Sequence, residues 1–213
     1  MKKILLEMKK MIDAKQTNKL TMLGEVEKEG SPFKILISTI LSSRTKDDTT
    51  YKASNRLFNE YKNPKELARA KVPDIKKLIK PVAFYKIKAK KIKQVAEIIY
   101  KEYDSKVPKE MEQLLELPLV GRKTANCVLV YGFREPAIPV DVHVHRISNR
   151  LGLVETGIPE ETEIELEKIT SKKYWIHVNE YFVKFGQLIC KPINPSCQEC
   201  KFQDTCKYLQ NKD

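Results

Sequence analysis

The sequence lacks several features that mark large classes of proteins. No apolar run approaches the roughly 20 residues that a membrane-spanning helix requires, so we expect a protein that does not enter the membrane. The first ten residues place charges on both sides of a short apolar stretch and do not resemble a signal peptide, which favours a reducing, cytoplasmic compartment. No Gly/Ser-rich linker divides the chain, so any two domains should pack closely.

Patterning typical of strands is also missing. Apolar and polar residues never alternate over a sustained stretch, whereas apolar residues recur at helical spacing almost everywhere. We therefore predict an all-α fold. Ser31-Pro32 and Asn63-Pro64 each read as an N-cap followed by the first helical position, and Pro108 should open a further helix.

Two longer helices should each bury one apolar stripe. The first carries its lysines on the opposite face, and the second leads into a cysteine-rich C-terminal segment. The two stripes consist of Ile92, Val95, Ala96 and Ile99, and of Trp175, Val178, Phe182 and Phe185.

Charge is strongly unbalanced in this chain of 213 residues. Forty Lys and Arg against 28 Asp and Glu give a formal net charge of +12, which favours a polyanionic partner. Nine lysines between Lys71 and Lys93 accompany a single acid, Asp74, whereas residues 160–167 are acidic. One face should therefore carry the positive potential. A solvated basic helix in a Lys- and Glu-rich protein is the alternative.

Four cysteines follow one another closely near the C-terminal end, with the spacing C-x6-C-x2-C-x5-C. They are Cys190, Cys197, Cys200 and Cys206. Because the intervening loops are short, the four thiolates can converge on one metal centre. Two disulfides are the alternative, but disulfides belong to oxidising compartments. Zinc sites usually separate two CxxC pairs by a longer insert, so the spacing alone leaves zinc and an iron–sulfur cluster open.

The segment LPLVGRKTA at residues 117–125 lies between two predicted helices and has room only for a tight hairpin. Gly121 should permit a backbone conformation that a β-carbon would hinder. The helix that starts near Arg122 should point free N–H groups outward, where an anion can bind. No Lys-Ser/Thr pattern follows a longer Gly-rich loop, so a nucleic-acid phosphate fits better than a nucleoside triphosphate. A simple turn is the alternative.

Two side chains near this hairpin are candidates for catalysis. Lys123 lies in the first helical turn beside Arg122, where positive neighbours favour its use as an uncharged amine nucleophile. Asp141 precedes a second helix and is most simply an N-cap, worth about 1 kcal/mol. Both groups should stand at helix starts that face an anion-binding cleft.

The segments LPLVGRKTAN and PVDVHVHR and the four-cysteine loop together resemble the endonuclease III family of DNA glycosylases. The resemblance extends from about Phe33, through LSSRTKD at residues 41–47, to Cys206. It implies a helix-hairpin-helix DNA glycosylase fold with an active-site cleft between two all-α lobes. The six-helix lobe would span residues 25–135, and the iron–sulfur lobe residues 1–24 with 136–213. The resemblance, not the spacing, implies a [4Fe–4S] cluster on the four cysteines.

The resemblance also implies roles for single residues. Lys123 would attack C1′ of the deoxyribose, release the damaged base and form a Schiff base that undergoes β-elimination. Asp141 would assist deprotonation and stabilise the developing positive charge. Relatives that only remove bases have Ser or Tyr at the position of Lys123, so this chain looks bifunctional.

Further residues would contact DNA. Arg44 would fill the gap left by the flipped base, and Phe84 would wedge beside the orphan partner. A phosphate contact for Arg44 and a core position for Phe84 are the alternatives. The remaining candidates for DNA contact are Asp47, Val120, Gly121, Arg122, Thr124, His143 and Lys191. For His143 a structural role is the alternative.

Two positions depart from the family pattern. Leu119 stands where the family usually has the first glycine of the hairpin, and Ala83 stands where a glycine is common in the wedge loop. If the hairpin position requires a positive φ, Leu119 costs about 1 kcal/mol or more.

The leading interpretation is a base-excision enzyme that removes oxidised pyrimidines, such as thymine glycol, from duplex DNA and cleaves the abasic site. We expect a monomer that acts on nucleoid DNA in the cytoplasm and uses its cluster structurally, with redox sensing as the alternative. Two other functions remain open: a mismatch glycosylase for thymine, uracil or adenine without lyase activity, and a non-catalytic DNA-binding module. The preferred lesion depends on packing and has no sequence motif.

Overall fold

The computed structural model describes residues 1–15, 26 and 31–211, and these residues form helices and no strand. The all-α prediction is therefore confirmed. The chain divides into two compact units, one formed by Met22–Arg134 and the other by Met1–Thr21 with Glu135–Asp213. The sequence placed the lobe boundaries after residues 24 and 135. No helix in the described part of the chain combines the length and apolar character needed to cross a bilayer.

The unit formed by residues 22–134 is arranged around α3 (Pro32–Ser42), a helix whose side chains are almost all buried. The helices that pack against it are α4 (Asp47–Glu60), α7 (Tyr85–Glu102) and α9 (Arg122–Cys127). The Oγ of Ser31 accepts a hydrogen bond from the N–H of Lys34 at 3.4 Å, and Pro32 is the first helical residue. The predicted start of this helix is confirmed.

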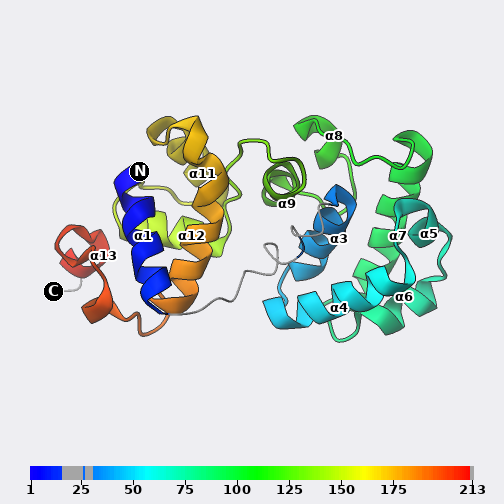
Figure 1. The fold of residues 1–213 in the computed structure, drawn as a ribbon, viewed down its shortest axis with the longest axis horizontal. Helices are drawn as coiled ribbons and strands as arrows, with labels where there is room; N and C mark the ends of the chain where they lie inside the picture. Colours follow the sequence, from blue (N-terminus) through cyan, green and yellow to red (C-terminus); the bar gives the residue numbers. More distant parts are fainter. Residues whose placement is uncertain (16–25, 27–30, 212–213) are drawn as a thin grey trace. The chain divides into compact units, whose positions relative to one another are not determined.

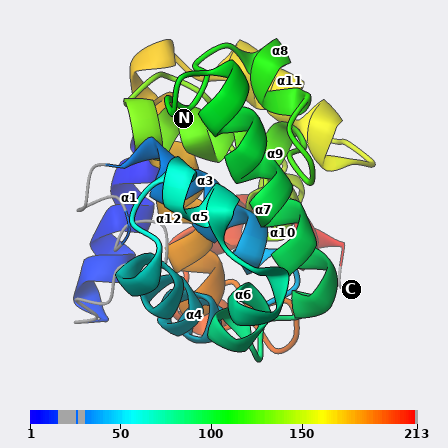
Figure 2. The same ribbon diagram turned by 90° about the vertical axis from the view of Figure 1, so that its right-hand side faces the viewer.

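Helix α7 packs against two shorter helices, α5 (Pro64–Arg69) and α6 (Val72–Ile79), which accompany it in Figure 2. The predicted cap of α5 is confirmed, since Asn63 accepts from the N–H of Glu66 at 3.0 Å. The apolar stripe of α7 is buried as expected. Its lysines are not all on the outer face, however, because Lys88 is only 4% exposed. For Lys88 the expectation was wrong.

The helix expected at Pro108 begins three residues later, as α8 (Met111–Leu115) with Glu110 as its N-cap residue. The expectation of a helix start at Pro108 was wrong, and the lack of a capping side chain before the proline does not explain it, since α11 (Pro159–Ile169) begins at Pro159 after Ile158 without one. The hairpin then leads into α9, which continues through the wider π-helical turn η1 (Val128–Gly132).

The second unit is built from residues 1–21 and 135–213. Its helices and single turns are α1 (Lys2–Ala14), α10 (Val142–Arg150), α11 (Pro159–Ile169), η2 (Lys172–Tyr174), α12 (Trp175–Leu188), η3 (Cys197–Glu199), η4 (Gln203–Thr205) and α13 (Lys207–Gln210). Helix α1 lies along α12, although the two are far apart in sequence (Figure 1). The core of this unit therefore joins both ends of the chain.

The predicted stripe on α12 supplies much of this core. Val178, Phe182 and Phe185 are fully buried and pack with Met8 of α1. Trp175 is only partly buried, and its indole N–H donates to a backbone carbonyl at 2.8 Å. An indole at the edge of a core satisfies its N–H in this way while its ring still packs. The helix that leads into the cysteines is thus anchored by aromatic packing.

Candidate functional site

The hairpin that precedes α9 closes with a hydrogen bond from the N–H of Val120 to the carbonyl of Leu117 at 3.1 Å. Leu119 has φ 62°, the left-handed region that favours glycine. The hairpin position of Leu119 thus has the positive φ under which a residue other than glycine was expected to be costly, and its β-carbon strains the backbone. The side chain is 49% exposed, so no burial offsets this strain.

Gly121 does not need its backbone freedom. Its φ of −105° and ψ of 179° are extended values that any residue adopts, so the expectation that a β-carbon would hinder this conformation was wrong. A β-carbon built on Gly121 would have no atom within 4 Å. Neither the backbone nor the packing of this unit requires the glycine, and its effect is to leave the approach to the first amides of α9 open.

The first turn of α9 carries the remaining hairpin candidates. Arg122 is exposed, Lys123 and Thr124 are partly buried, and Val120 is 7% exposed, which leaves its main chain rather than its side chain for any contact. Helix α9 packs against α3 and against α8, the other helix of the hairpin, and these contacts place the backbone of Lys123.

Two further loops of the same unit carry Arg44 and Phe84. The Cζ atom of Arg44 lies 5.9 Å from the centroid of the Phe84 ring. Phe84 is 56% exposed, which excludes a core position for it. Asp47 is the first residue of α4, where a carboxylate is stabilised by the positive end of the helix dipole.

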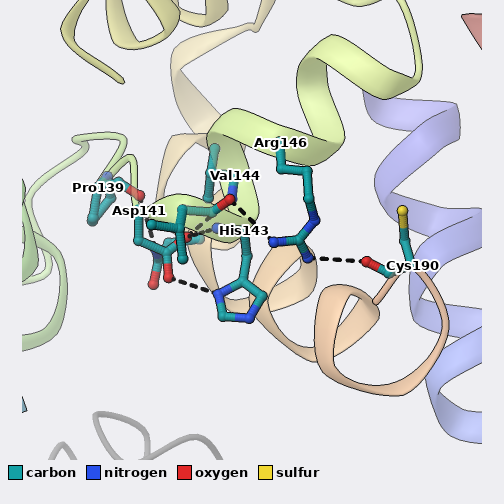
Figure 3. A network of polar contacts seen from close by, with 8 residues as sticks. Pro139, Asp141, His143, Val144, Arg146 and Cys190 are labelled. Carbon is teal, nitrogen blue, oxygen red and sulfur yellow. Dashed lines mark hydrogen bonds and ion pairs between the residues drawn. The ribbon is translucent and has the colours of Figure 1, made fainter. Parts of the chain in front are cut away.

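Asp141 caps α10 in the unit formed by residues 1–21 and 135–213 (Figure 3). Its Oδ1 accepts from the N–H groups of His143 and Val144, each at 2.9 Å, and its Oδ2 lies 3.1 Å from Nδ1 of His143. The predicted N-cap is confirmed. The ring of His143 orients the second carboxylate oxygen and gives this histidine a structural role.

Helix α10 also binds the start of the cysteine loop. Nη2 of Arg146 donates to the carbonyl of Cys190 at 2.9 Å (Figure 3). Gly186 of α12 makes room for this arrangement, because a β-carbon there would lie 2.7 Å from Cδ2 of His143 and 3.0 Å from Nη2 of Arg146. Substitution of Gly186 would thus displace both side chains.

The four cysteines line one common pocket together with residues of α10, α12 and α13. Burial raises the pKa of the Cys200 thiol, and its proximity to Cys190, Cys206 and Cys197 raises the pKa further. Across the described residues, however, no three His, Cys, Asp or Glu side chains are close enough together to bind one metal ion. The sulfurs therefore face a shared space without meeting at one point.

Arg150 orders the loop between the first two cysteines. Its guanidinium donates to the carbonyls of Lys191 at 2.7 Å and Pro192 at 2.9 Å, and it lies 3.6 Å from Sγ of Cys190. The same group stacks on the ring of Tyr208 at 4.2 Å. Lys191 is exposed at the surface of this loop.

The candidates thus fall into two groups. The unit of residues 22–134 holds Lys123, the hairpin, Arg44 and Phe84, and the other unit holds Asp141 and the four cysteines. Sequence reasoning missed the burial of Lys88 and the contacts of Arg150 and Gly186. For Lys88 a signal existed, because it precedes Ile92 by four residues and so continues the apolar stripe of α7.

Comparisons with known proteins agree on one family. Residues 37–172 match the HhH-GPD superfamily of base excision DNA repair proteins. Over 185 residues the chain is 50% identical to endonuclease III of Thermotoga maritima, and the alignment covers 87% of each protein. It is also similar to the structures of a non-covalent endonuclease III–DNA complex and of a trapped endonuclease III–DNA covalent intermediate. Each has a TM-score of 0.81 and 33% identity over 85% of both chains.

Replacing Leu119 with glycine should stabilise the protein by about 0.5–1 kcal/mol, because glycine adopts the left-handed conformation without strain. Urea unfolding of the two proteins measures the change. Leu119→Ala is the matched control and should bring no such gain, since it keeps the β-carbon. An equal gain from both substitutions would show that the exposed leucine side chain, not the backbone, causes the strain.

Replacing Gly186 with alanine should destabilise the protein by about 1–3 kcal/mol, the usual cost of forcing an extra methyl group into a packed core. Gly121→Ala is the comparison, and its stability should stay within about 0.5 kcal/mol of the parent, because the new methyl group meets nothing. Thermal unfolding followed by circular dichroism measures both. Equal effects at the two glycines would contradict the packing found around α10.

Proposed function

The chain belongs to the endonuclease III family within the HhH-GPD superfamily of base excision DNA repair proteins, and we propose that it is a bifunctional DNA glycosylase and AP lyase. The observation that carries this proposal is Lys123 in the first turn of α9, directly after the hairpin. Only an amine can form an iminium with the sugar, so a lysine here supports covalent lyase chemistry.

Lys123 would act as the nucleophile. Its nitrogen attacks C1′ of the damaged nucleotide, and the bond from C1′ to the base breaks, with its electron pair leaving on the base. Ring opening then gives an iminium between Lys123 and C1′. Loss of a proton from C2′ expels the 3′ phosphate by β-elimination, and hydrolysis of the iminium returns the free lysine.

Asp141 would supply the negative charge for this reaction. Its carboxylate can accept the proton that the attacking amine loses, and it can stabilise positive charge that develops on the sugar. The hydrogen bonds from the start of α10 and from His143 hold the carboxylate in one orientation before substrate arrives. A group fixed in advance needs no reorganisation during the reaction.

DNA binding by this chain is supported by its relatives in complex with DNA and by the net charge of +12. The first amides of α9, left open by Gly121, would bind a backbone phosphate. Arg122, Thr124 and Lys191 would add phosphate contacts, whereas Arg44 and Phe84 would enter the helix at the lesion.

The four cysteines line one pocket, and the membership in the endonuclease III family supports a [4Fe–4S] cluster there rather than a single zinc ion. Cys190, Cys197, Cys200 and Cys206 would hold a [4Fe–4S] cluster. Such a cluster would tie the loop that carries Lys191 to α10 and α13, which is a structural role.

The substrate would be duplex DNA with an oxidised pyrimidine, such as thymine glycol, or with an abasic site. The protein would act as a monomer on nucleoid DNA in the cytoplasm. These finer assignments rest on the resemblance to endonuclease III. Turnover on thymine glycol, uracil mismatches, oxidised guanine and plain abasic sites separates the lesion classes.

Borohydride should trap a covalent complex between the protein and abasic-site DNA, because it reduces the iminium to a stable amine. Lys123→Ala should abolish the adduct. Asp141→Asn should lower the rate of base removal by about 10²–10⁴-fold with little change in stability, since asparagine also caps helices well. Denaturing gels and single-turnover kinetics measure these effects. An adduct that survives Lys123→Ala, or none with the parent protein, would refute the proposed chemistry.

The purified protein should be brown and contain about four iron atoms per chain. Replacing Cys200 with serine should lower the iron content and expose residues 190–206 to proteolysis, because the loop loses one of its four ligands to the cluster. Cys127→Ser is the matched control and should keep its iron, since Cys127 lies in the other unit. A colourless protein with one zinc per chain would overturn the cluster assignment.

A further inference from the structure

Lys88 is a buried lysine whose ammonium group binds backbone rather than a carboxylate. Its Nζ donates to the carbonyl of Leu41 at 2.8 Å and to the carbonyl of Ser43 at 2.7 Å, and the residue is 4% exposed. Buried ammonium groups are costly unless they are fully hydrogen-bonded. The placement of this one therefore calls for a role that a leucine in the same stripe could not fulfil.

The two carbonyls belong to the C-terminal end of α3, where carbonyl groups lack partners within the helix. The C-cap residue, Ser43, is neither a glycine nor left-handed, so the usual way of closing a helix is not used here. The carbonyl of Ser42 accepts a hydrogen bond from the N–H of Thr45 at 2.9 Å. Lys88 donates to the carbonyls of the residues before and after Ser42. The chain is therefore fixed immediately before and after Arg44.

The same lysine lies one helical turn after Phe84 of the second loop. Its backbone N–H donates to the carbonyl of Phe84 at 3.0 Å, which is the ordinary first hydrogen bond of α7 and does not depend on the lysine side chain. A direct bond joins the loops as well, because the Oγ1 of Thr45 accepts from the N–H of Ala83 at 3.1 Å. Arg56 of α4 holds the other side of the second loop through the carbonyls of Leu78 and Lys80, at 2.8 and 2.6 Å.

Arg44 and Phe84 both have left-handed backbones, with φ values of 54° and 56°. Such conformations are strained for residues other than glycine and persist only where surrounding contacts determine them. The bonds made by Lys88 and Thr45 are those contacts. They present the two side chains next to each other, with 5.9 Å between the guanidinium carbon and the ring centroid.

We propose that Lys88 is the positioning residue that joins these two loops, so that Arg44 and Phe84 are preformed as one unit for the gap left by an extruded base. The proposal rests on the proposed function, since it assumes that this surface meets damaged duplex DNA. It extends that function by assigning the shape of the DNA-contacting pair to a residue that touches neither DNA nor the reacting atoms. Preformed contacts bind more tightly because less order must be gained on binding.

The charge state of Lys88 gives the proposal a measurable signature. Burial lowers the pKa of its ammonium group from 10.5 to about 8. Desolvation is the cause of this change in pKa. The charged side chains on the elements around Lys88 are Lys34 of α3, Lys65, Glu66 and Arg69 of α5, Asp74, Lys76 and Lys77 of α6, and Arg44, Lys46 and Asp47 beside the first loop.

Two opposite trends follow as the pH rises above 8. The amine loses its charge, so its bonds to the two carbonyls weaken, because charge-assisted hydrogen bonds are about twice as strong as neutral ones. The unfolded chain meanwhile keeps its proton up to a pKa of 10.5. It then binds more protons than the folded chain, and this group makes the fold more stable as the pH rises from about 8 to 10.5. Loop order and stability should change in opposite directions.

The first experiment uses duplex DNA with a tetrahydrofuran abasic analogue, which the enzyme cannot cleave, opposite the fluorescent base 2-aminopurine. Lys88→Met removes two charge-assisted hydrogen bonds; it should weaken binding at pH 7 by about tenfold or more and remove most of the fluorescence change. Lys93→Met is the matched control. This lysine lies on the same helix and binds the carbonyl of Ala68 away from the loops, so the response should be unchanged.

The second experiment separates positioning from a merely structural role. Affinity of the parent protein for this duplex should fall as the pH rises from 7 to 9. Lys88→Arg stays charged throughout this range and should retain binding at pH 7 without the fall. Thermal unfolding of Lys88→Met should show no loss of stability that matches the loss of affinity. Unchanged binding and fluorescence in Lys88→Met would overturn the proposal, as would parallel losses of stability and affinity.

A double-mutant cycle links the effect to Arg44. If Lys88 acts through the loop, Lys88→Met should add little to the affinity already lost in Arg44→Ala, whereas fully additive losses would contradict the proposal. Failure of the proposed function can be distinguished from failure of the role of Lys88. If the proposed function is wrong, the parent protein itself forms no borohydride adduct, or does not prefer the abasic duplex to undamaged DNA.

Discussion

An α-helix leaves its first N–H groups and its last carbonyl groups without partners inside the helix. Two of the candidate functional residues of the protein supply such missing partners. Asp141 accepts hydrogen bonds from the start of α10, and Lys88 donates to the end of α3. Each side chain stabilises a helix end and is therefore held in one position before any ligand binds. A charged group fixed in this way can serve binding or catalysis without a further loss of conformational entropy.

The cysteine loop follows the same logic with arginines as donors. The carbonyls of Cys190, Lys191 and Pro192 lie in irregular backbone, which has no regular partner of its own. Arg146 and Arg150, one turn apart on α10, donate to all three. Helix α10 thus presents the Asp141 carboxylate at its start and orders the cysteine loop with its later residues. The close packing of α10 against α12 at Gly186 fixes the helix that carries both the Asp141 carboxylate and the two arginines.

Much of this fold could be predicted because its signals are local. A serine or asparagine before proline identified the starts of α3 and α5, and Asp141 was identified as a cap from its place before an apolar helix. Proline alone is a weaker signal because it fixes only one dihedral angle: Pro159 is the first residue of α11, whereas Pro108 lies three residues before α8. The burial of Lys88 could have been predicted from its place four residues before Ile92, but its partners could not, because Lys88 and Gly186 both contact helices that are distant in sequence, and composition and local spacing carry no information on such contacts.

In the unit of residues 22–134, several residues other than glycine have left-handed backbones, namely Arg44, Phe84, Asp104, Ser105, Leu119 and Arg134. Phe84 and Leu119 have left-handed backbones, yet their apolar side chains are 56% and 49% exposed. Strain of this kind costs on the order of 1–3 kcal/mol per residue, and exposed apolar groups contribute little burial in return. Selection for stability alone would place glycine or a polar residue at both positions. Because Phe84 and the hairpin are among the proposed DNA contacts, substitutions at Phe84 and Leu119 should separate affinity for DNA from the stability of the fold.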